Sequence, residues 1–163
     1  MRVLGIDPGN VESAYVLLDD NLKPVRFGKV KNEELSDMIY RGLSDECTGV
    51  AIEMIASYGM AVGETIFDTC VWIGRFTEQV INESGITPTY IYRKDEKMNL
   101  CHTMKAKDSN IRQALIDRFG IVGKKASPGF FYGFKSDIWA AMAVGVTYYD
   151  MYVAKEQTCQ GSI

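Results

Sequence analysis

The sequence predicts a single α/β domain, spanning 1–163, built on a five-stranded mixed sheet with helices on both faces. Three apolar, β-prone runs joined by short turns open the chain, and helical and extended patterns alternate after them. The length of 163 residues and the 47% hydrophobic content suit one core, because a domain of roughly 150 residues buries about 68–70% of its unfolded surface.

The first three strands are expected at 2–7, 11–18 and 23–30. Pro8-Gly9-Asn10 separates the first two, and Asp19-Asp20-Asn21 separates the second and third. Proline, glycine, asparagine and aspartate are the usual residues of tight turns. Short turns between consecutive strands predict an antiparallel meander.

Helices and strands alternate in the remainder of the chain. A helix beginning near Lys31 places Leu35, Met38, Ile39 and Leu43 on one face, which is typical of an amphipathic helix. Glycines or prolines end several of the later elements. The further elements are a strand at 48–54, a helix at 64–83, a strand at 89–92, a helix at 106–119 and a last helix at 136–154 that Ser136 caps.

Composition excludes several classes of protein. No apolar run approaches the roughly 20 residues of a membrane helix, and the first residues do not resemble a signal peptide, so we expect a cytoplasmic protein without a membrane partner. The cysteines form no C-x-x-C pair, and His102 is the one histidine, which argues against zinc and against a histidine base. Acid–base or phosphoryl chemistry would therefore depend on carboxylates and a metal ion. The cysteines are Cys47, Cys70, Cys101 and Cys159.

The net charge of −3 does not by itself indicate a nucleic-acid partner. Basic residues gather in the middle and late chain, however, at 93–94, 105–112 and 124–135. They predict either one positive face on an acidic body or an ordinary mixed surface.

Three acids occur where a folded chain normally avoids charge. Asp7 and Glu53 each end an apolar run, and Asp137 opens the last helix. Each has an ordinary explanation, as a turn residue, a strand-edge charge or a partner of the helix dipole. Brought together they would repel, and a divalent cation would relieve that repulsion. Oxygen ligands favour Mg²⁺, with Mn²⁺ as a substitute, and one or two ions at such a site can hydrolyse a phosphodiester.

The chain resembles the RuvC Holliday junction resolvases of the ribonuclease H-like superfamily, and within them the resolvases of bacteriophages of low-GC Gram-positive hosts. The resemblance implies a ribonuclease H-like fold and a homodimer that nicks four-way DNA junctions with Mg²⁺, as in DNA recombination and repair. Four segments carry the resemblance: Gly5-Ile6-Asp7-Pro8-Gly9, Ile52-Glu53-Met54, the stretch 106–115 beginning Ala106-Lys107-Asp108, and 137–144 beginning Asp137-Ile138-Trp139.

The same resemblance assigns roles to individual residues. Asp7, Glu53 and Asp137 would be catalytic metal ligands, and Lys107 would lie near the scissile DNA backbone. Further DNA contacts are expected from Lys105, Arg112 and Tyr58, the first two on charge and proximity.

Two departures from the family pattern stand out. The family often has a second acid or a histidine three residues from the acid of the last helix, where this chain has Phe134 or Ala140. Asp108, Glu64 and Asp68 are conceivable substitutes. The aromatic residue that the family inserts at the junction centre is Ala56 here, with Tyr58 two residues later, so branched DNA in general is a second possible substrate.

Two further segments have both functional and structural interpretations. The aromatic loop at 127–134 would stack on unpaired bases or seal the last helix onto the sheet. The broad apolar surface of the helix at 64–83 indicates a dimer seam or a helix buried under loops.

The alternative functions are a ribonuclease H-like nuclease on other substrates, a junction-binding protein with weak or lost cleavage, and an actin-like phosphotransferase. The Gly-Ile-Asp-Pro-Gly segment also resembles the phosphate-binding hairpin of the phosphotransferases, but the chain is too short for their two lobes.

Overall fold

A computed structural model describes residues 1–57 and 59–155 and contains the predicted five-stranded mixed sheet. The strand order is β3-β2-β1-β4-β5. The first three strands form the expected antiparallel meander, whereas β4 pairs with β1 in parallel and β5 pairs with β4 in parallel. The strands are β1 (Val3–Asp7), β2 (Glu12–Leu18), β3 (Pro24–Lys31), β4 (Gly49–Met54) and β5 (Thr89–Tyr92).

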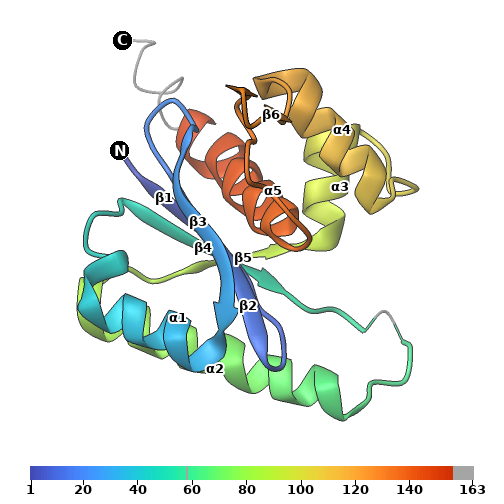
Figure 1. Ribbon diagram of the computed structural model, residues 1–163. Coiled ribbons are helices and arrows are strands. Elements are labelled where there is room, and N and C mark those ends of the chain that lie inside the picture. The colour runs from blue at the N-terminus through green and yellow to red at the C-terminus, as the bar shows by residue number, and fades with distance from the viewer. Residues whose placement is uncertain (58, 156–163) are drawn as a thin grey trace, which may run out of the picture.

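Helices cover both faces of this sheet (Figure 1). One face carries α1 (Asn32–Met38), the kinked segment η1 (Ile39–Leu43) and the long α2 (Glu64–Ser84). The other carries α3 (Arg93–Cys101), α4 (Asp108–Phe119) and α5 (Ile138–Tyr148), which runs on into the π-helical turn η2 (Tyr149–Val153). A two-stranded hairpin, β6 (Gly123–Lys124) and β7 (Ser127–Pro128), follows α4. No helix in the described ranges is long and apolar enough to cross a membrane.

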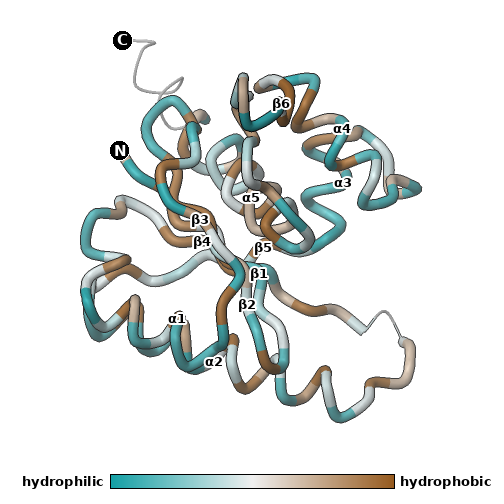
Figure 2. Tube along the Cα trace, viewed as in Figure 1, coloured by the Kyte–Doolittle hydropathy of each residue, from teal (hydrophilic) through white to brown (hydrophobic). Residues whose placement is uncertain are grey.

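Alternation along the central strands divides the core into two layers. In β1, Leu4 and Ile6 pack toward α1 and α2, whereas Val3 packs toward α5. In β4, Val50 and Ile52 likewise face α2, and Ala51 packs against Val144 of α5. Because side chains of a strand alternate between faces, the final acid of each run belongs to the α5 side. Figure 2 shows the apolar residues of the strands lying between the helical layers.

The aromatic loop belongs to the core. Phe131 and Phe134 are buried against each other and against Trp139, with ring centroids 4.8–5.2 Å apart. Phe130 stacks on Phe119, and Tyr132 alone among the four aromatics of the loop is exposed. The structure thus supports the interpretation that this loop seals the last helix onto the sheet.

The central helix α5 lies unusually close to β1. A Cβ atom on Gly5 would come within 2.4 Å of the carbonyl oxygen of Ala141 and 2.9 Å of the backbone nitrogen of Gly145. Only a residue without a side chain permits this approach. The contact fixes the distance between the strand that ends in Asp7 and the helix that begins after Asp137.

Three expectations about the helices were wrong. The helix α3 was not predicted, because the charged run 93–97 resembles a solvated loop. The helix α4 begins at Asp108 and not at 106, because Lys107 has the extended backbone of an N-cap and its N–H donates to Asn110. Ser136 does not cap α5: Asp137 precedes the helix, and the Ser136 hydroxyl donates to the Asp137 carboxylate at 3.0 Å.

Candidate functional site

Asp7 and Glu53 meet at the carboxyl ends of the two central parallel strands. Gly5 pairs with Ala51 and Ile6 with Ile52, so the next residue of each strand points toward α5 at the same level. The two carboxyl groups lie close enough for each to feel the other's charge. Burial, and then the negative charge of Glu53, raise the pKa of Asp7 to about 9. At neutral pH Asp7 therefore retains its proton unless a cation replaces it.

The turn after Asp7 is held by a buried polar network. The backbone N–H of Gly9 donates to the Ser13 hydroxyl, which itself donates to Oδ1 of Asn32 at 2.6 Å. The Asn32 amide donates in turn to the carbonyl of Gly9 at 2.9 Å. Because buried hydrogen bonds of this kind are costly to break, the network fixes the backbone from which Asp7 projects.

Asp137 lies beside this pair but is engaged by a lysine. Its carboxylate contributes to the raised pKa of Asp7, which places the three predicted acids at one end of the sheet. Its Oδ2 forms an ion pair with Nζ of Lys29 on β3, at 2.7 Å. This contact lowers the pKa of Asp137. Within the described ranges, no three His, Cys, Asp or Glu side chains are gathered tightly enough to enclose an ion as they stand.

A fourth acid, Glu96, belongs to the same cluster and was missed by the sequence analysis. It lies in the first turns of α3, and its side chain is 0% exposed. Burial and the charge of Glu53 raise the pKa of Glu96 well above its ordinary value, and Glu96 contributes in turn to the raised pKa of Asp7. Its place in the charged run 93–97 gave no sequence signal of burial.

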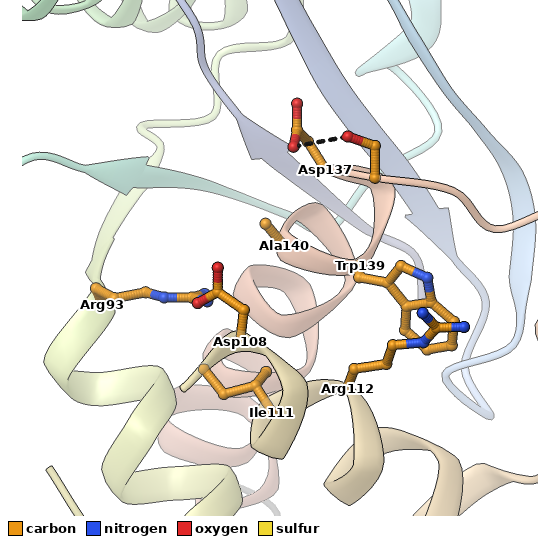
Figure 3. Close-up of a pocket in the computed structure, with 8 residues that line it drawn as sticks. Arg93, Asp108, Ile111, Arg112, Asp137, Trp139 and Ala140 are labelled. Atoms are coloured by element: carbon orange, nitrogen blue, oxygen red, sulfur yellow. Dashed lines mark hydrogen bonds and ion pairs between the residues drawn. The ribbon is translucent and has the colours of Figure 1, made fainter. Parts of the chain in front are cut away.

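A small cavity adjoins the cluster (Figure 3). Arg93 contacts both Glu96 and Asp108, and it lines the cavity together with Arg112 and Asp137. Ala140 lies between Asp137 and Arg93, and it offers no ligand atom. Phe134, the other position at which the family pattern places a second acid, is buried among aromatic rings.

The candidate substitutes for that acid fall in two places. Asp108 lies at the cavity, where Arg93 engages it. Glu64 and Asp68 are exposed on α2, which covers the opposite face of the sheet.

The predicted DNA-contacting residues border the same side of the molecule. Lys107 is the exposed N-cap residue of α4, and Lys105 is exposed just before it. The Arg112 guanidinium lies 4.7 Å from the ring centroid of Trp139, at the edge of the cavity. Tyr58 lies outside the described residues.

The donor set fits a hard divalent cation. Every acid of the cluster offers carboxylate oxygens, which Mg²⁺ and Mn²⁺ prefer. Burial and then the charge of Glu53 raise the pKa values of Asp7 and Glu96, and a bound cation would offset both effects. Asp7, Glu53 and Asp137 are the residues that would hold the ion.

The pH dependence of metal-free stability tests this electrostatic description. The folded protein keeps the Asp7 proton up to pH about 9, whereas the unfolded chain loses it near 3.8. The Asp7 contribution to folding stability therefore falls as pH rises from about 4 to 9. In EDTA at pH 8, Asp7→Asn should raise Tm by about 2–8 °C, the range expected when a strained functional charge is removed from a domain of this size.

Thermal unfolding of both proteins across this pH range, monitored by circular dichroism, measures the effect. The difference in Tm should vanish near pH 4. A variant that is less stable than the wild type at pH 8, or that has the same pH slope, would show that Asp7 is not under electrostatic strain.

Comparison with solved structures identifies the fold. The structure of Thermus thermophilus RuvC superimposes with a TM-score of 0.68 at 19% sequence identity, covering 97% of this chain and 98% of that one. Thermus thermophilus RuvC in complex with a Holliday junction substrate gives 0.70 at 16% identity, covering 97% of each chain. No protein-family model matches the sequence, and no curated protein sequence matches it. The chain therefore has the RuvC-type, ribonuclease H-like fold, as predicted.

Proposed function

We propose that this protein is a metal-dependent endonuclease that nicks four-way junctions and other branched DNA. The observation that carries the proposal is the pairing of Asp7 and Glu53, two mutually repelling acids that the fold brings together at the carboxyl ends of parallel strands. Acids are rarely placed together in this way without a cation. The similarity in fold to a RuvC that has been solved with a Holliday junction supports the choice of substrate.

The residues divide into a cation-binding group and a DNA-binding group. Asp7, Glu53 and Asp137 would hold one or two Mg²⁺ ions, for which Mn²⁺ substitutes. When bound, the cation supplies an activated water and stabilises the leaving oxygen. To bind the cation, Asp137 would give up its ion pair with Lys29. Lys29 would then remain beside the site as a positive charge.

The DNA backbone passes over the exposed basic residues on this side. Lys107 neutralises the phosphate next to the scissile bond, and Lys105 and Arg112 bind phosphates further along. Arg112 is held in place by its contact with Trp139, so its position changes little on binding. Tyr58, in the segment that follows β4, is proposed to contact bases at the branch point.

The protein is proposed to act as a homodimer in the bacterial cytoplasm. Phe67 and Val71 are four residues apart on α2 and are 60% and 52% exposed, which supports an apolar seam on this helix. A two-fold dimer would present two sites to two symmetry-related strands. Sedimentation of a monomer at micromolar concentration would contradict this assembly. The relation to bacteriophage resolvases rests on the sequence motifs and stays a prediction.

Cleavage of defined DNA substrates tests the proposed function. A synthetic four-way junction, a linear duplex of the same sequence and an RNA–DNA hybrid are incubated with Mg²⁺, Mn²⁺ or Ca²⁺ and analysed on denaturing gels. We expect paired nicks in the junction with Mg²⁺ and Mn²⁺, little cleavage of the duplex and none with Ca²⁺.

Two other outcomes identify the alternatives. Equal or faster cleavage of the hybrid would indicate a ribonuclease H-like nuclease of different specificity. Tight junction binding without nicking in either Mg²⁺ or Mn²⁺ would identify a binding protein, for which the absence of a second acid at Phe134 and Ala140 is the structural reason.

A further inference from the structure

Of the two oxygens of the Glu96 carboxylate, the structure provides a hydrogen-bond donor for one. One of its oxygens, Oε2, accepts from the guanidinium of Arg93 in the preceding turn of α3. The other, Oε1, is buried and has no hydrogen-bond partner among the described residues. A buried acceptor left without a partner destabilises the folded state, and more so when it is charged.

The surroundings of Glu96 make this cost larger. Glu53 repels its charge, and Asp7 is repelled by it in turn, so Arg93 offsets only part of the local negative charge. Arg93 is also shared with Asp108. For folding alone, a glutamine or an apolar residue of similar size would serve better than glutamate at this position. A cation bound near Asp7 and Glu53 would account for the acid.

The fold explains how Glu96 reaches the site. In the sheet, β5 lies next to β4, with Ile91 opposite Glu53 and Tyr92 opposite Met54. The helix α3 begins immediately after Tyr92, where the Tyr92 N–H donates to Asp95 at 3.1 Å. Glu96 therefore follows a neighbouring parallel strand, in line with Asp7 at the end of β1 and Glu53 one residue before the end of β4. The last helix supplies Asp137 but no second acid, because Phe134 and Ala140 occupy the two candidate positions.

We propose that Glu96 is the fourth carboxylate of the cation site, with its free Oε1 as the atom that contacts the ion or a water bound to it. This inference rests on the proposed function and adds α3 to the elements that build the site. In this chain, the charge that the family pattern places on the last helix comes from the helix that follows β5.

Mn²⁺ binding to the full-length protein without DNA tests the role of Glu96 separately from catalysis. Isothermal titration with MnCl₂ compares the wild type with Glu96→Gln, which keeps the shape and a hydrogen bond to Arg93 but removes the charge. We expect the Mn²⁺ dissociation constant to rise about 10–100-fold, the usual range for a lost partner of a metal site. The metal-free Tm of this variant should equal or exceed that of the wild type.

Asp108→Asn is the matched control, because it removes the same charge and the other carboxylate that Arg93 contacts. Its Mn²⁺ affinity should stay within about threefold of the wild type. Equal losses in both variants would mean that Glu96 acts only by anchoring Arg93, and an unchanged affinity in Glu96→Gln would overturn the inference. If Glu96→Gln does not fold, Glu96→Met, an apolar residue of similar size, is judged by the same criterion.

Failure of this inference is distinguishable from failure of the proposed function. A wild type that nicks the junction and binds Mn²⁺, beside a Glu96→Gln variant that binds it equally well, refutes the role of Glu96 alone. A wild type that neither binds Mn²⁺ nor nicks refutes both.

Discussion

Glu53→Gln is expected to slow nicking of a four-way junction by about 10²–10³-fold or more while junction binding in Ca²⁺ survives. The reason is that Glu53 lies beside Asp7 on the neighbouring strand and repels its charge, so it belongs to the group proposed to hold the cation. Loss of one preorganised electrostatic contact to the reacting centre commonly costs this much in rate. DNA affinity depends on phosphate contacts from basic residues, which the substitution leaves intact. Asp7→Asn should behave in the same way.

Single-turnover cleavage on denaturing gels, with electrophoretic mobility shifts in Ca²⁺, measures the two properties separately. Glu64→Gln is the matched control, because it makes the same chemical change at an exposed position on the opposite layer of the fold. Its cleavage rate should match that of the wild type. Loss of junction binding together with cleavage in Glu53→Gln would show that the residue supports the DNA-binding surface and not the cation.

Gly5→Ala is expected to destabilise the fold by about 1–3 kcal/mol or more, because the added methyl group meets backbone atoms on α5. The clash involves the carbonyl of Ala141 at 2.4 Å and the nitrogen of Gly145 at 2.9 Å, neither of which can rotate away. For a domain of this size the loss corresponds to a fall in Tm of roughly 2–12 °C. Moving α5 away from β1 also separates Asp137 from Asp7, so Mn²⁺ affinity should fall as well.

Gly74→Ala provides the control for this substitution. Gly74 is exposed within α2, and a Cβ there would meet no atom within 4 Å. Alanine should stabilise the helix by up to about 1 kcal/mol. Denaturant unfolding of both variants gives the free energies of unfolding. A Gly5→Ala protein as stable as the wild type, with unchanged Mn²⁺ affinity, would show that the close approach of α5 to β1 is not required.

The sheet was predictable because its strands have strong local signals. Apolar residues fill β1, β2 and β4, and turn residues separate the first three strands, so the meander follows from the sequence alone. The end of α2 was also predictable, because Gly85 adopts the left-handed backbone, with a φ of 70°, that commonly terminates a helix. The helix α3 was not predictable, because its burial comes from packing against α4 and α5 and not from its own composition.

Some residues of the candidate site were likewise predictable from the sequence, and others were not. Asp7 and Glu53 were identifiable because an acid at the end of an apolar strand is unusual, and alternation places both on one face. Glu96 lies within a charged run, and only the tertiary structure shows that its side chain is fully buried. The ion pair between Lys29 and Asp137 joins β3 to the start of α5, a pairing that no local pattern specifies.

An anomalous-difference map from crystals grown with Mn²⁺ tests most directly whether these acids form a cation site. We expect a manganese peak between the carboxylates of Asp7 and Glu53, with Asp137 turned from Lys29 toward the ion. Clear density for Asp7 and Glu53 at saturating Mn²⁺ with no peak beside them, and with Asp137 still paired to Lys29, would contradict a cation site here.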